Sequence, residues 1–153
     1  MRIIFLDYDG VVNNLVFHTI DGEPDFYYDR TKGKPRQVND FQAVAWLNKI
    51  CREFNCEIVV TSTWRSSDKY KEYLYNAGFK GRIIGRTPSL GTKRGLEIQE
   101  WLNNNKEKTI EDFIILDDDA DMVHLKSHLI QTNTFRGLGF AEYEQIRERW
   151  KNK

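Results

Sequence analysis

The sequence predicts an α/β domain with a central, mainly parallel five-stranded sheet. Five short apolar runs alternate with helix-patterned stretches, and residues 3–6 (IIFL) are apolar without interruption, which is typical of a strand buried on both faces of a parallel sheet. Two of the runs end in clustered aspartates. Because open α/β sheets bind ligands at the carboxyl ends of their strands, these acids mark one edge of the predicted sheet as a candidate site.

The composition is consistent with one domain over residues 1–153. The chain is 40% hydrophobic and 13% aromatic, which is enough for a single core. Lys plus Arg and Asp plus Glu both number 23, so no overall charge attracts nucleic acid or anionic lipid, and any such preference must be local. No apolar run approaches the length of a membrane span. Cys51 and Cys56 lack metal-type partners, so we expect reduced thiols and a cytoplasmic location.

The first predicted strand ends in Asp7-Tyr8-Asp9-Gly10. Gly10 permits a sharp turn behind the two carboxylates. Two like charges in one place are unfavourable unless something compensates them, and a divalent cation with a phosphate is the usual compensation. The alternative interpretation is an acidic turn after an edge strand.

Residues 14–38 are the least regular part of the sequence. Turn residues spaced between apolar stretches favour a hairpin or a long flap, and loops of this length in a small domain are often functional covers. The segment also carries four cations: Arg30, Lys32, Lys34 and Arg36.

Asn39 and Asp40 then form a predicted helix cap, and an apolar stripe predicts a helix over residues 41–54. Residues 56–60 are a second strand, which ends in Thr61-Ser62-Thr63-Trp64-Arg65. Hydroxyls at a strand end can hold phosphate oxygens without adding a competing charge.

The next helix is expected to be capped within residues 66–68 and to end near Ala77, before Gly78. With that cap assigned, the three hydroxyls of residues 61–63 have no obvious structural task. The alternative is that they belong to the capping turn. Residues 82–85 predict a short third strand.

Lys93 and Arg94 precede a helix in which Ile98, Trp101 and Leu102 share a face. Cations at the amino end of a helix oppose its dipole, so their position indicates a site, although most lysines are simply solvated.

A fourth strand over residues 112–116 again ends in acid, at residues 117–121 (DDDAD). Two aspartate clusters would repel each other if the strand ends met without a cation. Residues 128–131 predict a fifth strand, and residues 141–151 predict a closing helix.

In this order, Asp7-Tyr8-Asp9-Gly10, Ser62, Lys93 and Asp117-Asp118 resemble the motifs of the haloacid dehalogenase (HAD) superfamily of phosphatases, over nearly the whole chain. The stretches VVTSTWR, KRGLEIQEWL and ILDDDADM are similar to the small HAD domains related to the phosphatase half of polynucleotide kinase/phosphatase and to RNA-repair proteins. The resemblance implies a three-layer Rossmann-like fold, with the first strand between the second and fourth and only a small flap as cap.

The resemblance also implies phosphomonoester hydrolysis through an aspartyl phosphate. Asp7 would be the nucleophile, and Asp9 the general acid and then the base. Ser62, or alternatively Thr61, would bind the phosphoryl group. Lys93, or alternatively Arg94, would neutralise its oxygens.

Mg²⁺ is the implied cofactor, held by Asp7, the main-chain carbonyl of Asp9 and Asp117, with Asp118 or Asp121 acting directly or through water. The candidates for substrate or phosphate binding are Gly10, Thr61, Thr63, Trp64, Arg65 and Arg94.

Without room for a cap domain, an open site would accept a phosphate at the end of a large molecule. The four flap cations, together with Trp64, Arg65, Arg82 and Arg86 near the carboxyl edge of the sheet, could follow a nucleic-acid backbone and stack a base, so nucleic-acid ends or nucleotides are candidate substrates. The alternatives are a small-metabolite phosphatase and a non-catalytic binding or regulatory module. The sequence leaves the oligomeric state open.

Overall fold

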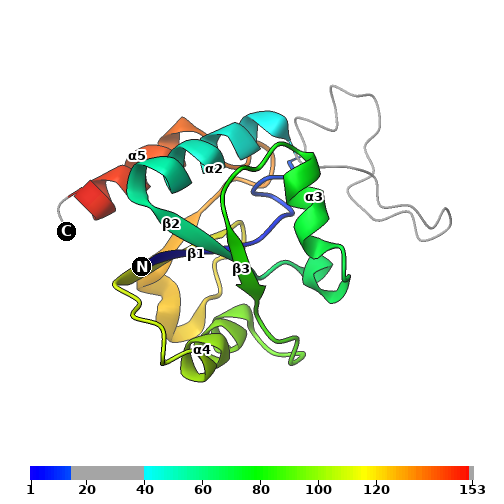
Figure 1. The fold of residues 1–153 in the computed structure, drawn as a ribbon, viewed down its shortest axis with the longest axis vertical. Coiled ribbons are helices and arrows are strands. Elements are labelled where there is room, and N and C mark those ends of the chain that lie inside the picture. Colours follow the sequence, from blue (N-terminus) through cyan, green and yellow to red (C-terminus); the bar gives the residue numbers. More distant parts are fainter. Residues whose placement is uncertain (15–39, 152–153) are drawn as a thin grey trace, which may run out of the picture.

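The computed structural model describes residues 1–14 and 40–151 (Figure 1). The predicted flap and its four cations fall almost entirely in residues 15–39, outside the described residues. The elements, in chain order, are β1 (Arg2–Leu6), α2 (Phe41–Phe54), β2 (Cys56–Val60), the 3₁₀ helix η1 (Thr63–Ser66), α3 (Tyr70–Asn76), β3 (Ile83–Arg86), α4 (Arg94–Asn104), β4 (Asp112–Asp117), the 3₁₀ helix η2 (Val123–His128), β5 (Leu129–Gln131) and α5 (Phe140–Lys151).

The described strands form one five-stranded sheet in the order β3-β2-β1-β4-β5, and all its neighbouring pairs are parallel. The predicted fold class and the central position of β1 are therefore confirmed. Leu6 lies opposite Val60 on one side and opposite Leu116 on the other. The residues that follow these three positions consequently reach the same edge of the sheet.

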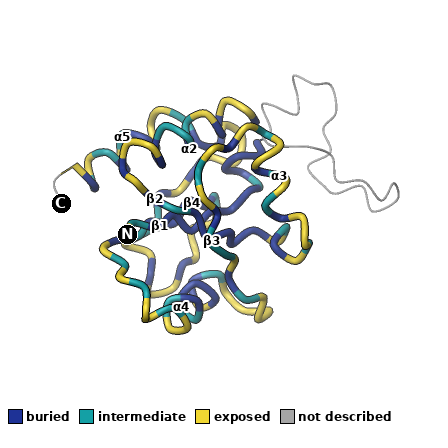
Figure 2. Tube along the Cα trace, viewed as in Figure 1, coloured by how far each residue is buried: buried dark blue, intermediate teal, exposed yellow. Residues whose placement is uncertain are grey.

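Helices cover both faces of the sheet, which gives three layers (Figure 1). Alternate residues of a strand point to opposite faces, and β1 divides accordingly. Ile4 and Leu6 belong to the core that includes the buried faces of α2 and α5, whereas Ile3 and Phe5 belong to the core under α4. Figure 2 shows the buried strands between helices whose outer faces are exposed. This double burial explains why residues 3–6 of β1 and 113–116 of β4 are uninterrupted apolar runs.

One stretch differs from its prediction. The segment after β2 forms the 3₁₀ helix η1, and α3 begins only at Tyr70. Ser62 caps η1, since its hydroxyl accepts a hydrogen bond from the Trp64 N–H (3.3 Å), and Ser67 accepts one from the Lys69 N–H (3.1 Å). The inference that Ser62 has no structural task was therefore wrong.

Two further predictions concern the environment of the protein. Cys51 and Cys56 are buried and free, as expected for reduced thiols. Among the helices of the described ranges, none is long and apolar enough to cross a membrane.

Gly95, in the first turn of α4, allows the helix to pack closely against the chain before η2. A Cβ at this position would overlap the backbone carbonyl of Met122, which cannot turn aside as a flexible side chain can. We expect Gly95→Ala to lower the free energy of unfolding by about 1–3 kcal/mol, the usual cost of overpacking. Urea denaturation measures this loss.

Gly85→Ala is the matched control. A Cβ at Gly85 would make an ordinary contact with the indole of Trp101, so we expect no loss of stability from it. Equal stability of the two variants would contradict the close packing at Gly95.

Candidate active site

The two aspartate clusters meet at the carboxyl edge of the sheet. The Asp7 N–H extends the β1–β4 ladder by donating to the Leu116 carbonyl (3.0 Å). Asp7, Asp117 and Asp118 each place one carboxylate oxygen within 4.8 Å of the others. We call these three residues the acidic cluster. Asp7 and Asp117 are buried, so their mutual repulsion is only weakly screened by water.

Arg94 supplies the positive charge at this cluster. Its Nη1 lies 2.9 Å from Asp7 Oδ2 and 2.5 Å from Asp117 Oδ2. Burial raises the pKa of both carboxyls, while the guanidinium opposes this rise. Burial also disfavours the charged guanidinium, but the two carboxylates outweigh it and raise the pKa of Arg94.

The sequence left Lys93 and Arg94 as alternatives for the cation of the site, and the backbone places them differently. Lys93 is the extended residue before α4, and its ammonium pairs at the surface with Asp121 (2.7 Å). Arg94, the first helical residue, points to the acidic cluster. The same ion pair holds the Asp121 carboxylate, whereas Asp118 is part of the cluster.

Gly10, which was predicted to contact the phosphate, has a structural task in the turn after Asp9. Its φ is 76°, and a Cβ would overlap the carboxylate of Asp118. Its N–H donates to the Asn13 carbonyl (2.6 Å), and its own carbonyl accepts from the Thr132 hydroxyl (2.7 Å). The backbone groups of Gly10 are therefore used within the protein, and the missing side chain admits Asp118 to the site.

Asp9 occupies a different environment from Asp7. The Asn13 amide donates to its Oδ1 (2.7 Å), and the Trp64 indole N–H donates to its Oδ2 (3.0 Å). Burial raises the pKa of Asp9, and these two donors partly oppose that rise. Sequence reasoning missed Asn13, because nothing in its pattern distinguishes it from other turn asparagines. It also gave Trp64 a contact with substrate and not with Asp9.

The three hydroxyls after β2 differ in exposure. Thr61 and Ser62 are fully buried, and Thr63 is exposed. The Thr61 N–H donates to the Leu6 carbonyl (2.8 Å), which extends the ladder to the site edge. Among the residues that the structure describes, the Thr61 hydroxyl has no hydrogen-bond partner.

Arg65, which was predicted to contact substrate, makes extensive contacts within the protein. It is buried and forms an ion pair with Glu97 (2.6 Å). Its guanidinium also donates to four backbone carbonyls, those of Thr61, Ser62, Thr87 and Pro88. Arg65 thus ties the loop after β2 to the loop after β3 and to α4. A cavity of about 510 Å³ lies between these elements, lined in part by Thr63 and Arg94.

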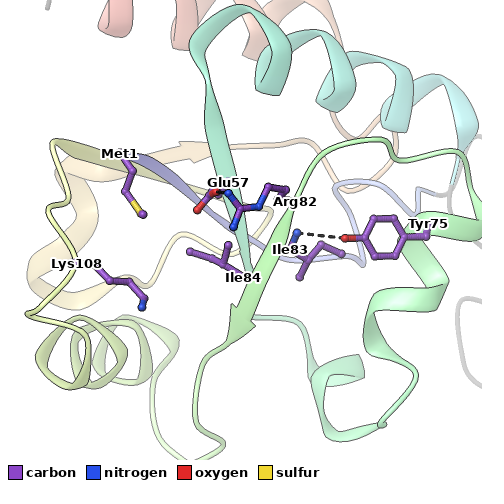
Figure 3. A pocket seen from close by; sticks show the side chains of 7 residues that line it. All are labelled: Met1, Glu57, Tyr75, Arg82, Ile83, Ile84 and Lys108. Carbon is purple, nitrogen blue, oxygen red and sulfur yellow. Dashed lines mark hydrogen bonds and ion pairs between the residues drawn. The ribbon is translucent and has the colours of Figure 1, made fainter.

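Arg82 was wrongly expected at the carboxyl edge of the sheet. It precedes β3 and lines a cavity of about 450 Å³ at the opposite edge, where it pairs with Glu57 (2.6 Å) (Figure 3). Arg86 does lie at the carboxyl end of β3, but its guanidinium donates to the Arg65 carbonyl (2.6 Å) and lies 4.9 Å from the centre of the Tyr70 ring.

The ligand set of the acidic cluster is consistent with Mg²⁺. It consists of carboxylate oxygens alone, the hard ligands that Mg²⁺ prefers, and it contains neither the thiolate nor the imidazole typical of zinc sites. A bound cation would also compensate the repulsion among the three carboxylates.

Comparison with protein-family models identified one match over most of the chain. Residues 3–142 match the family described as the HAD domain in Swiss Army Knife RNA repair proteins. Comparisons with curated proteins and with solved structures gave no match. The matched range runs from β1 to the first turn of α5 and contains both the acidic cluster and Asp9. The chain therefore belongs to the family of HAD domains in Swiss Army Knife RNA repair proteins.

Proposed function

We propose that the chain is a Mg²⁺-dependent phosphomonoester hydrolase that removes a terminal phosphate from RNA through an aspartyl-phosphate intermediate. The observation that carries the proposal is that two carboxylates of the same turn lie in different environments. Asp7 lies in the acidic cluster beside Arg94, whereas Asp9 is held by Trp64 and Asn13. Two carboxyl groups in different environments suit a nucleophile and a general acid.

In the proposed reaction, an Asp7 oxygen attacks phosphorus, and the bond from phosphorus to the leaving oxygen breaks. Asp9 protonates that oxygen, then removes a proton from the water that hydrolyses the aspartyl phosphate. Ser62 and Arg94 bind the phosphoryl oxygens. Asp7, Asp117 and Asp118 would hold Mg²⁺, with the main-chain carbonyl of Asp9 as a further ligand, and the ion would stabilise the charge of the transferring group.

Trp64 serves as a positioning residue in this scheme. Its backbone N–H bonds the Ser62 hydroxyl and its indole N–H bonds Asp9, so one residue links the phosphate-binding hydroxyl to the acid. Its ring and that of Tyr73 pack edge to face, at a centroid distance of 5.0 Å. This packing limits rotation of the indole and thereby fixes the carboxyl plane of Asp9.

The support for an RNA substrate is the family itself, whose description names RNA repair proteins. The two alternative functions are a small-metabolite phosphatase and a non-catalytic binding module. Phosphate-release assays distinguish both from an RNA phosphatase.

The first prediction concerns the nucleophile. We expect Asp7→Asn to lower phosphate release by at least about a thousandfold, since the neutral amide cannot replace the attacking carboxylate. The assay measures inorganic phosphate, with Mg²⁺ and with EDTA, from an aryl phosphate, mononucleotides and oligoribonucleotides phosphorylated at either end.

Asp121→Asn is the control, because this exposed carboxylate pairs with Lys93 and we expect little loss from its removal. Survival of activity in Asp7→Asn would refute the nucleophile assignment. If the unmodified protein released no phosphate from any substrate, a non-catalytic binding module would be favoured. Turnover of small esters alone would favour a small-metabolite phosphatase.

The second prediction concerns metal binding and does not require turnover. At about ten times its dissociation constant, Mg²⁺ should stabilise the fold by about 1.4 kcal/mol, which raises Tm by about 3–6 °C for a domain of this size. We expect Asp117→Asn to abolish the shift and Asp121→Asn to keep it. A shift of the same size in both variants would exclude the acidic cluster as the metal site.

The third prediction concerns Trp64. Trp64→Phe keeps an aromatic ring but removes the donor to Asp9. We expect kcat/KM to fall about ten- to hundredfold for alkyl phosphates, whose leaving oxygen needs a proton, and much less for p-nitrophenyl phosphate. The parameter kcat/KM reports only the steps up to and including release of the leaving group, so the later hydrolysis of the intermediate does not affect it. Tyr73→Phe, which keeps the ring, is the control. Equal losses on both substrates would show that Trp64 does not position the acid.

A further inference from the structure

The loop of residues 132–138, which we call the rim loop, is fixed directly beside the acidic cluster. Its Thr132 N–H donates to the Asp117 carbonyl (2.9 Å). The Thr134 hydroxyl donates to Asp118 Oδ2 (2.8 Å). At its far end, the Leu138 N–H donates to the Val11 carbonyl (2.8 Å), next to the turn that carries Asp9. The rim loop thus borders both carboxylate environments of the proposed active site.

The tip of the rim loop is held by Asn133. Its side-chain Oδ1 accepts hydrogen bonds from the backbone N–H of Phe135 (2.9 Å) and of Arg136 (3.3 Å), and its carbonyl accepts from the Gly137 N–H (2.7 Å). Gly137 has a φ of 64°, and a Cβ there would overlap the Val11 carbonyl. These bonds restrict the backbone on which Phe135 and Arg136 stand.

The two side chains at this tip are displayed to solvent. Phe135 is 62% exposed, and Arg136 is also exposed. Within residues 1–14 and 40–151, no aromatic ring stacks on Phe135 and no carboxylate pairs with Arg136. Phe140 is similarly exposed, but its ring packs against Trp46 and Tyr143. An exposed apolar ring and an exposed cation therefore occupy consecutive positions, directly after Thr134, which bonds Asp118.

We propose that Phe135 and Arg136 form the docking surface for the nucleotide adjoining the scissile phosphate in a single-stranded RNA end, an inference that rests on the proposed function. One base stacks on the face of Phe135, and Arg136 contacts a phosphate of the chain. Proteins that bind single-stranded nucleic acid combine these two contacts, because every base has a π-face and every linkage carries a negative charge.

The occupant is a single strand for a physical reason. At the end of a duplex, the terminal base is held by its pairing partner and by the neighbour stacked on its inner face, so it can turn onto Phe135 freely only where the strand is unpaired and the base can leave the stack. A small phosphomonoester without a base would enter the site and gain nothing from Phe135. The surface therefore separates polynucleotide ends from metabolite phosphates.

The test measures both binding and turnover. With Asp7→Asn protein, which should bind substrate without consuming it, fluorescence anisotropy gives the Kd for a short single-stranded oligoribonucleotide with a terminal phosphate. We expect Phe135→Ala to raise this Kd about tenfold, within the range for loss of one stacked base. In the otherwise unmodified chain, the ratio of kcat/KM for the oligonucleotide to kcat/KM for p-nitrophenyl phosphate should fall by a similar factor.

Three further variants identify the contact. Phe135→Tyr keeps the aromatic face and should retain tight binding, whereas Phe135→Leu keeps apolar bulk alone and should behave like Phe135→Ala. Arg136→Gln should reduce the salt dependence of Kd, because one fewer phosphate is neutralised. Phe140→Ala is the control for an equally exposed ring and should leave Kd unchanged.

Several outcomes would overturn the proposal: no measurable binding of the oligonucleotide, an unchanged Kd in Phe135→Ala, or the same loss in Phe140→Ala. Equal falls in kcat/KM for both substrates would also do so, since a damaged active site lowers both. Failure of the proposed function is seen separately, as absence of Mg²⁺-dependent phosphate release from p-nitrophenyl phosphate by the unmodified chain.

Discussion

Charge repulsion at the carboxyl edge of the sheet is the constraint on which the site depends. The register places the ends of β1 and β4 side by side, so Asp7 and Asp117 meet in a buried position with Asp118 beside them. Such an arrangement is unfavourable without positive charge. Arg94 supplies it in the structure, and Gly10 makes room for the third carboxylate. Both Arg94 and Gly10 thus serve to accommodate three carboxylates at one edge of the sheet.

A second constraint is the separation of the two acids of a single turn. Asp9 is two residues from Asp7 but faces neutral donors in place of a guanidinium. The loops around them are held by the buried pair of Arg65 and Glu97. Backbone carbonyls accept further hydrogen bonds from the Arg65 guanidinium, and the Glu97 carboxylate accepts one from the Leu90 N–H. Breaking one member of such a pair leaves an uncompensated charge, so its value here lies in fixing loop positions more than in net stability.

Most of the fold could be predicted from the sequence, because strands buried on both faces are continuous apolar runs and parallel strands bring their ends to one edge. The acids of the site followed from the same reasoning. The contacts among side chains did not. The start of α4 decides whether Lys93 or Arg94 faces the acids, and that depends on backbone geometry. Arg65 is buried by a partner 32 positions away, and Trp64 meets Asp9 across 55 positions. No local pattern encodes such pairs.

The central position of β1 has a consequence for how the protein folds. Its neighbour β4 lies near the other end of the sequence, so the pairing of Leu6 with Leu116 closes a very long loop. Closing such a loop is entropically costly and slows folding. Until that step is complete, the acids at the ends of β1 and β4 are not held close together in space. The buried acids Asp7 and Asp117 are therefore brought together only when β1 and β4 pair, so the apolar strands must supply the energy that holds the two carboxylates side by side.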